Sequence, residues 1–293
     1  MKNKHIEVIV NPASGQKVLN LRVLNAVFKK YKYDWDVSIT NRAGDAAKFA
    51  KKASKRGSIV VAYGGDGTVK EVAGGLVGTN ALMGIIPGGT GNVMSIELGI
   101  SADQREAAEI IAKPEINTRK IDVGLTEDKE YFVLHAAMGL SAQMIHNAPR
   151  SAKNNLGQLA YVFGAFAAIQ SPIESTYQLE IDGKKSEAKG VTCIICNAGS
   201  IGLPGLKMDE DVLIDDGKLD VFIIDSAELG ALVDVAKNLL QKNMGVPHLE
   251  HWKGSKIVVT ATPKQPGQLD GEVYTKKRIA ISVIPQAVNI IVP

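Results

Sequence analysis

Gly64-Gly65-Asp66-Gly67-Thr68 is the stretch that decides the fold. The run before it, Ser58–Tyr63, is apolar and β-branched, which is typical of a buried strand. The run after it, Val69–Val77, has the pattern of a helix. A strand that stops at glycines and restarts as a helix leaves backbone N–H groups free at the positive end of the helix dipole. Because glycine has no Cβ, a phosphate can approach these groups closely.

Asp66 places a carboxylate among these phosphate-binding amides. The phosphates would repel it unless a cation bridges the two groups. The stretch therefore predicts a nucleotide bound together with its Mg²⁺. A single glycine loop is more often an ordinary turn, so this interpretation depends on the rest of the chain.

The first part of the chain alternates strands with helices, which predicts a parallel sheet covered by helices on both faces. The expected strands are Ile6–Val10, Trp35–Ile39, Ser58–Tyr63 and Leu82–Ile86. The expected helices are Val18–Tyr31, Gly44–Lys55, Val69–Val77, Val93–Leu98 and Ser101–Ala112, the last of them begun by a capping box of Ser101 and Gln104.

Three loops of this part have the composition of phosphate or ribose sites. They are Asn11–Gly15, Gly64–Thr68 and Gly88–Asn92. In a parallel sheet every strand-to-helix loop lies at the same edge, so we expect the three loops to converge. Their convergence is far more specific than any one loop and favours a nucleotide site.

After Pro114 the pattern changes to strands with few helices, which predicts an antiparallel sandwich or barrel-like second domain. The expected strands are Ile121–Gly124, Tyr131–Ala137, Thr176–Ile181, Gly190–Cys196, Lys218–Ile224, Lys256–Thr262 and Arg278–Val283. Two helices are expected among them, at Gly157–Gln170 and Ala227–Asn243. The change of period alone sets the domain boundary near residue 120.

Composition excludes several classes of function. The formal net charge of the 293 residues is only +3, so charge makes no case for a nucleic-acid partner. Cys193 and Cys196 fit a reducing compartment and a buried strand better than a redox pair. The longest apolar stretch, Leu159–Ile169, is about half of a membrane span. We therefore expect a cytoplasmic protein that can still touch the inner membrane face.

Taken together, these motifs resemble the diacylglycerol kinase catalytic-domain family, in its bacterial lipid kinase branch, which is related to sphingosine and ceramide kinases. The matches run in the family's order from Asn11 to the C-terminus. They are Asn11–Gly15, Thr40 with Gly44–Ala46, Gly64–Thr68 with Glu71, Pro87–Asn92, Gly157–Tyr161, Asp216–Val221 and Asp270–Glu272.

The resemblance implies an N-terminal doubly wound parallel sheet, as in NAD kinase and diacylglycerol kinase, and a C-terminal antiparallel β-sandwich, with the active site in a cleft between them. The nucleotide-binding domain would comprise residues 1–120 and a returning segment, residues 284–293, and the lipid-substrate domain residues 121–283. ATP-binding positions would be Asn11, Pro12, Ser14, Gly15, Thr40, Gly64, Gly65, Asp66, Gly67, Thr68, Glu71, Gly89, Thr90 and Asn92.

The implied activity is ATP- and Mg²⁺-dependent transfer of the γ-phosphoryl group to a lipid hydroxyl, with diacylglycerol as the first expected acceptor. Asp66 would act through Mg²⁺ on the phosphates, and Glu272 would be the general base that takes the hydroxyl proton. The residues alone leave an alternative for Glu272, which is a solvated turn residue after Asp270-Gly271.

The resemblance also implies a second, structural Mg²⁺ at Leu213, Asp216 and Lys218, held by two backbone carbonyls and one carboxylate. The alternative is that Asp216-Gly217 is only a hairpin turn. Both interpretations stay open at this point.

Some positions depart from the family pattern. Lys70 replaces a usual asparagine or histidine, Val93 stands where many relatives have aspartate, and His135-Ala136 lie where many have asparagine. The departures at Lys70 and Val93 leave open an inactive nucleotide- or lipid-binding regulator. An NAD kinase-like enzyme is a second alternative, because NAD kinases share the Gly-Gly-Asp-Gly-Thr loop. The acyl acceptor and the oligomeric state, a homodimer included, are not fixed by the sequence.

One basic helix face adds a membrane hypothesis. Lys48, Lys51, Lys52, Lys55 and Arg56 share one face of the expected helix at Gly44–Lys55. A solvated helix face is the simpler explanation. Attraction to anionic lipid, worth about 1 kcal/mol per cation, is the functional one.

Overall fold

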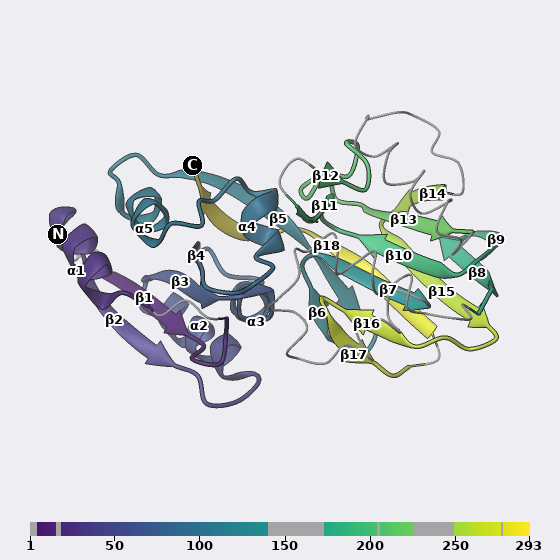
Figure 1. Cartoon of the computed structure of the whole chain (residues 1–293), viewed down its shortest axis with the longest axis horizontal. Helices are drawn as coiled ribbons and strands as arrows, with labels where there is room; N and C mark the ends of the chain where they lie inside the picture. The colour runs from purple at the N-terminus through teal and green to yellow at the C-terminus, as the bar shows by residue number, and fades with distance from the viewer. Residues whose placement is uncertain (1–4, 16–18, 140–172, 204–205, 226–248, 277) are drawn as a thin grey trace. The chain divides into compact units, whose positions relative to one another are not determined.

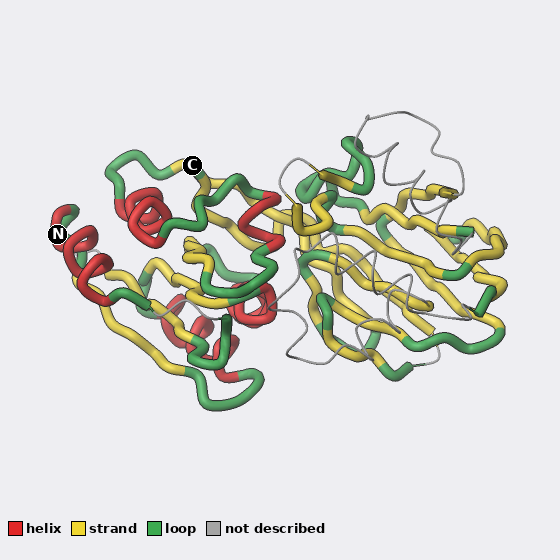
Figure 2. Tube along the Cα trace, viewed as in Figure 1, coloured by secondary structure: helices red, strands yellow, loops and turns green. Residues whose placement is uncertain are grey.

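The computed structural model describes residues 5–15, 19–139, 173–203, 206–225, 249–276 and 278–293. It divides into two compact units, Met1–Ile121 with Gln286–Pro293, and Asp122–Pro285. The first unit is an α/β domain and the second is built mainly of strands (Figure 2).

The sheet of the first unit is parallel, as the alternation of strands and helices predicts. Its order is β2 (Asp34–Ile39), β1 (His5–Val10), β3 (Ile59–Gly64), β4 (Leu82–Pro87) and the end of β18 (Arg278–Val292). β18 joins through Asn289 and Ile290, which pair in parallel with Leu82 and Met83. β1, β3 and β4 are buried along nearly their whole length because helices cover both faces.

Within the described residues of the first unit, five helices accompany this sheet: α1 (Leu21–Lys30), α2 (Asp45–Lys55), α3 (Asp66–Leu76), α4 (Val93–Glu97) and α5 (Gln104–Ala112). α1 packs against α5, and α2 packs against α3. The two pairs lie on opposite faces of the sheet (Figure 1), which is what right-handed crossovers produce for this strand order.

Three helix starts differ from the predictions. α1 begins at Leu21 rather than Val18, with Asn20 as its N-cap, because the Asn20 side chain accepts from Val23 N. α3 begins at Asp66 rather than Val69, so the glycine loop supplies its first turn. The capping box at Ser101 and Gln104 is wrong, because Asp103 is the N-cap of α5 and its carboxylate accepts from the backbone N–H groups of Arg105 and Glu106. Ser101 donates instead to the Glu106 carboxylate.

The second unit is the predicted antiparallel β-sandwich. One layer has the order β14 (Leu249–Gly254), β13 (Leu219–Ile224), β10 (Thr192–Cys196), β7 (His135–Gly139), β16 (Gly267–Leu269) and β17 (Glu272–Tyr274). The other contains the first part of β18, β15 (Lys256–Thr262), β8 (Ser175–Ile181) and β9 (Lys184–Gly190). Two further groups of strands lie in the described part of this unit. β5 (Asn117–Thr126) begins in the first unit and pairs with β18 and β6 (Tyr131–Phe132), and β11 (Ser200–Leu203) pairs with β12 (Leu206–Lys207).

Inward-facing side chains from both layers form one apolar core. Tyr177 and Leu179 of β8 share it with Ile195 of β10 and Val221 of β13. β8 alternates buried and exposed positions, as a strand with one solvated face should.

The strand expected at Tyr131–Ala137 is broken into β6 and β7. The break falls at Val133 and Leu134, whose backbone N–H groups donate to a side chain instead of a neighbouring strand. The helices expected at Gly157–Gln170 and Ala227–Asn243 lie outside the described residues. No helix in the described part of the chain is long and apolar enough to cross a bilayer.

Candidate active site

The three predicted loops converge at the carboxyl edge of the parallel sheet. Gly88 N donates to Gly64 O at 2.9 Å, and Gly65 N donates to Ser14 Oγ at 3.2 Å. Ser14 Oγ also lies 3.3 Å from Thr68 Oγ1. Direct hydrogen bonds therefore join each outer loop to the central one.

Two glycines allow this close approach. Gly15 has φ +64°, and a Cβ there would lie 2.0 Å from Gly88 O. A Cβ on Gly89 would lie 2.4 Å from Gly65 Cα. The loops thus pack backbone against backbone, and their shape excludes side chains at these points.

The first loop is shaped by its own polar residues. Asn11 Oδ1 accepts from Ala13 N at 3.0 Å, an Asx turn, and Asn11 O accepts from Ser14 N at 3.1 Å. Pro12 is exposed at the tip of this turn. Asn11 and Pro12 therefore set the course of the loop, and Ser14 links it to the central loop.

Asp66 lies in the centre of the convergence and connects two helices. It is the first residue of α3, and its Oδ1 accepts from Met94 N at 3.1 Å, in the first turn of α4. The N-cap of α4, Asn92, makes no side-chain cap of its own. Burial raises the pKa of the Asp66 carboxyl, while the backbone N–H groups of Met94 and Val93 act in the opposite direction.

The side chain of Asn92 makes its hydrogen bonds within the third loop. Its Oδ1 accepts from Gly89 N at 2.9 Å and its Nδ2 donates to Gly89 O at 2.8 Å. Thr90, between them, is exposed. The loop is thus closed around Gly89 by one side chain, and Thr90 is presented to solvent.

Thr40 and Glu71 lie at the neighbouring strand end. Thr40 is buried and its N donates to Val10 O at 2.9 Å. The Glu71 carboxylate accepts from Gly44 N at 2.9 Å and Ala46 N at 3.2 Å, so it caps α2. Glu71 therefore supports the loop after β2 rather than facing the three phosphate loops with a free carboxylate.

In the second unit, Glu272 is exposed and is the first residue of β17. It follows Asp270 and Gly271, which have φ +48° and +82° and join β16 to β17. Positive φ at both residues of a two-residue hairpin loop is the geometry that Asp-Gly favours.

Asp270 anchors this turn. Its carboxylate accepts from the backbone N–H groups of Val133 at 2.7 Å, Leu134 at 2.9 Å and His135 at 2.9 Å. The sequence alone predicts only that Asp270 is part of a turn. The same carboxylate explains why the strand breaks between β6 and β7, since it replaces strand partners for three consecutive amides.

His135 and Asn197 pack around the anchored turn. Burial lowers the pKa of His135 to about 4, so the imidazole is neutral near pH 7, and its Nε2 donates to Ala198 O at 2.9 Å. Asn197 is fully buried, and its Nδ2 donates to Asp122 O and Val133 O. These residues hold the segment that Asp270 binds.

We expect Asp270→Ala to lower the free energy of unfolding by about 2–4 kcal/mol, because three amides lose a charged acceptor. If Glu272 is the base that the family resemblance implies, the folded variant should also show slower phosphoryl transfer, because Glu272 loses its anchored turn. Thermal unfolding and turnover would be measured on the same preparation.

Asp182 supplies a matched control for this variant. It also begins a two-residue Asp-Gly turn with φ +49°, and its carboxylate accepts from Ser255 N and Lys256 N. Asp182→Ala should therefore destabilise the sandwich while the folded protein keeps its turnover. Equal turnover losses in the two variants would show that Asp270 has no positioning role.

The predicted structural metal residues lie in the loop before β13. Leu213 is exposed, and Asp216 Oδ1 accepts from Lys218 N at 2.9 Å. Asp216 Oδ2 lies 2.8 Å from Lys253 Nζ, an ion pair that the sequence analysis did not expect. The arrangement joins Asp216 to the Lys218 backbone, and a divalent ion there stays a prediction.

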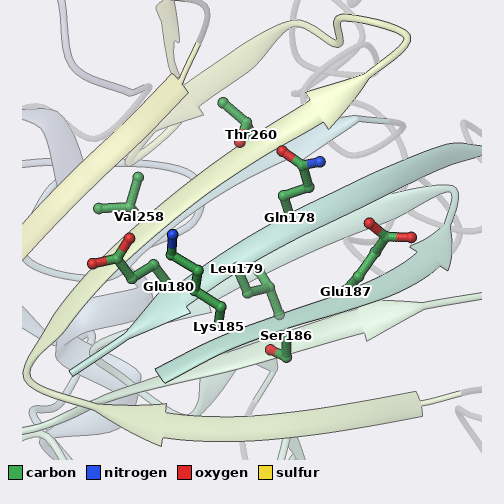
Figure 3. Close-up of a pocket in the computed structure, with 8 residues that line it drawn as sticks. All are labelled: Gln178, Leu179, Glu180, Lys185, Ser186, Glu187, Val258 and Thr260. Carbon is green, nitrogen blue, oxygen red and sulfur yellow. The ribbon is translucent and has the colours of Figure 1, made fainter. Parts of the chain in front are cut away.

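A shallow groove of about 560 Å³ lies on the solvated face of β8, β9 and β15 (Figure 3). Gln178, Glu180, Lys185 and Glu187 project into it, so both signs of charge are present. The residues that line it include no position from the predicted sites. We therefore assign it no role in catalysis.

The structure thus combines an α/β unit, in which three glycine-containing loops converge at one edge of a parallel sheet, with a β-sandwich unit. Residues 5–126 match the family model described as diacylglycerol kinase catalytic domain. Residues 135–292, more than half of the chain, match the model described as YegS C-terminal NAD kinase beta sandwich-like domain.

Individual relatives agree with these matches. A diacylglycerol kinase of Bacillus subtilis is 30% identical over 279 residues, which is 92% of this chain and 90% of that protein. An uncharacterized protein of Synechocystis is 29% identical over 310 residues, which is all of this chain and 71% of that one. A crystal structure of a diacylglycerol kinase from Bacillus anthracis has a TM-score of 0.80 at 24% identity, covering 100% of this chain and 98% of the other. This chain belongs to the diacylglycerol kinase family, a family of lipid kinases.

Proposed function

We propose that the protein uses ATP and Mg²⁺ to phosphorylate a lipid hydroxyl, with diacylglycerol as the first candidate and phosphatidic acid as its product. The observation that carries the proposal is the hydrogen-bonded convergence of three strand-to-helix loops, with Asp66 at its centre. Family membership favours a lipid acceptor. The B. subtilis relative named diacylglycerol kinase favours this particular lipid.

The donor half of the reaction belongs to the first unit. Backbone N–H groups at the start of α3 and in the neighbouring loops would bind the phosphates, as helix N-termini do in other phosphate sites. When bound, Mg²⁺ would neutralise charge that develops on the transferred group. Asp66 would hold it, because a carboxylate keeps acceptor sites beyond the one that caps α4.

The acceptor half requires a base. Glu272 is exposed on a turn that Asp270 fixes, which suits a carboxylate that must meet a substrate hydroxyl in a defined orientation. We propose that Glu272 accepts the hydroxyl proton as the oxygen attacks the γ-phosphorus. The hydroxyl oxygen gains the phosphoryl group, and ADP leaves with the electrons of the broken bond.

A direct assay separates this proposal from its rivals. The protein would be given γ-labelled ATP with dispersed diacylglycerol or with NAD, in matched reactions with and without Mg²⁺. Label in phosphatidic acid supports the proposal, and label in NADP supports the NAD kinase-like alternative. ATP binding without transfer to any of a panel of lipid alcohols would support the inactive regulator.

We also propose a peripheral contact with anionic membranes through α2. Lys51, Lys52 and Lys55 are exposed on the face opposite the buried alanines of this helix. Replacing all three by glutamate should weaken binding to phosphatidylglycerol vesicles, more strongly at low salt, where screening is weaker. Co-sedimentation would measure the fraction of protein bound to the vesicles at each salt concentration.

The control is an equal charge change elsewhere in the first unit. Arg22, Lys29 and Lys32 are exposed in and after α1. Their replacement by glutamate alters the net charge by the same amount. Similar losses of vesicle binding in both triple variants would mean that net charge alone explains the effect. In that case α2 would not be a specific membrane contact.

A further inference from the structure

Lys253 places its ammonium group among oxygens of three aspartates, two in the loop before β13 and one in β13. Its Nζ lies 2.8 Å from Asp216 Oδ2, 2.8 Å from Asp211 O and 3.4 Å from Asp220 Oδ2. Lys253 is on β14 and faces Asp220 on the adjacent β13, two strands that run side by side (Figure 1). One cation thus links the loop before β13 to both strands.

Asp220 is a buried carboxylate that a nearby positive charge stabilises. Its side chain is 1% exposed, and its Oδ1 pairs with His251 Nε2 at 2.7 Å. Its other oxygen, Oδ2, is buried without a hydrogen bond and lies beside the ammonium. A buried carboxylate is strongly unfavourable without a nearby opposite charge, and Lys253 supplies one.

The same geometry conflicts with a divalent ion on Asp216. One carboxylate oxygen accepts from Lys218 N, and the other is 2.8 Å from the ammonium. Mg²⁺ would need to approach that oxygen to about 2.0–2.1 Å. Two cations at one oxygen repel each other, so the residues present do not fit a Mg²⁺ ion beside Lys253.

We propose that the Lys253 ammonium is the structural cation of this loop and stands in place of a divalent ion. The loop before β13 is then held by a covalently attached charge. Its stability should not depend on metal concentration. Removing the ammonium should leave Asp216, Asp220 and the Asp211 carbonyl around an acidic space that a divalent ion can enter.

The test is thermal unfolding without nucleotide, in EDTA and in millimolar Mg²⁺. The wild-type midpoint should be the same in both. Lys253→Met should lower the midpoint in EDTA by roughly 5–10 °C. Mg²⁺ should recover part of this loss, since an ion that binds the native state alone stabilises it.

Lys276→Met is the matched control, because Lys276 also pairs with an aspartate of the second unit, Asp128, at 3.1 Å. It should show neither the large loss nor the response to Mg²⁺. A Lys253→Met loss no larger than the control's, or one that Mg²⁺ leaves unchanged, would overturn the proposal.

The wild-type titration decides the question even if Lys253→Met fails to fold. A saturable rise of the wild-type midpoint with Mg²⁺ that Asp216→Asn removes would show that a divalent ion holds the loop. That result would overturn the role of Lys253. None of these measurements depends on kinase activity, so they stay informative whichever substrate the enzyme uses.

Discussion

Asp66→Asn is expected to reduce phosphoryl transfer by at least about 10³-fold while the protein stays folded. The amide removes the negative charge that would hold the nucleotide's Mg²⁺. It keeps an oxygen that can accept from Met94 N, so the cap of α4 survives. Turnover with diacylglycerol and the thermal midpoint would be measured together.

Asp66→Ala is the informative companion. It removes the charge and the cap, so it should lose the same turnover and also about 1 kcal/mol of stability. If Asp66→Asn retains near wild-type turnover, the carboxylate has no part in handling Mg²⁺ and serves only α4. If both variants lose activity only in proportion to unfolded protein, the same conclusion follows.

Asp66 also illustrates how much of the candidate site can be predicted from the sequence. Alternating strands and helices predict that the three glycine loops meet at one sheet edge, because parallel topology leaves no other arrangement. The pattern does not say what each polar side chain does there. A carboxylate or an amide near a helix N-terminus suits a phosphate site and a cap equally well. In the structure Glu71 caps α2 and Asn92 closes its own loop.

The second unit was harder to predict for a different reason. The sandwich follows from strands with one apolar face, but β9 reads Lys-Lys-Ser-Glu-Ala-Lys-Gly and buries only Ala188 and Gly190. The short strands β16 and β17 have too few residues for a period to show. β9 is held by the adjacent hairpin strand β8, whereas β16 pairs with β7, which lies far earlier in the chain.

Long-range polar contacts lay beyond the sequence analysis for the same reason. Asp270 binds amides at Val133–His135, and Lys253 reaches Asp216. Nothing near Lys253 distinguishes it from a solvated lysine. For Asp270 the sequence does predict a tight turn, because it is followed by glycine. The three hydrogen bonds that its carboxylate accepts cannot be predicted, because they depend on how the strands are arranged in the fold.

Glu272→Gln is the second variant with a large expected effect. General-base assistance is typically worth about 10²–10⁴-fold, and turnover should fall by about that factor. Glutamine keeps the shape of the side chain and removes its basicity. Because Glu272 is exposed at the start of β17, the thermal midpoint should stay near that of the wild type.

The ATP affinity of Glu272→Gln distinguishes the possible causes of a loss of turnover in this variant. The proposed nucleotide residues are in the first unit and Glu272 is in the second, so ATP should bind Glu272→Gln nearly as tightly as wild type. A large loss of ATP affinity would make Glu272 a nucleotide or metal residue instead of the base. Unchanged turnover would return it to a solvated turn position and leave Asp66 as the carboxylate to test as base. A loss of turnover at constant ATP affinity, together with normal turnover in Asp182→Ala, would assign the acceptor chemistry to the turn that Asp270 anchors.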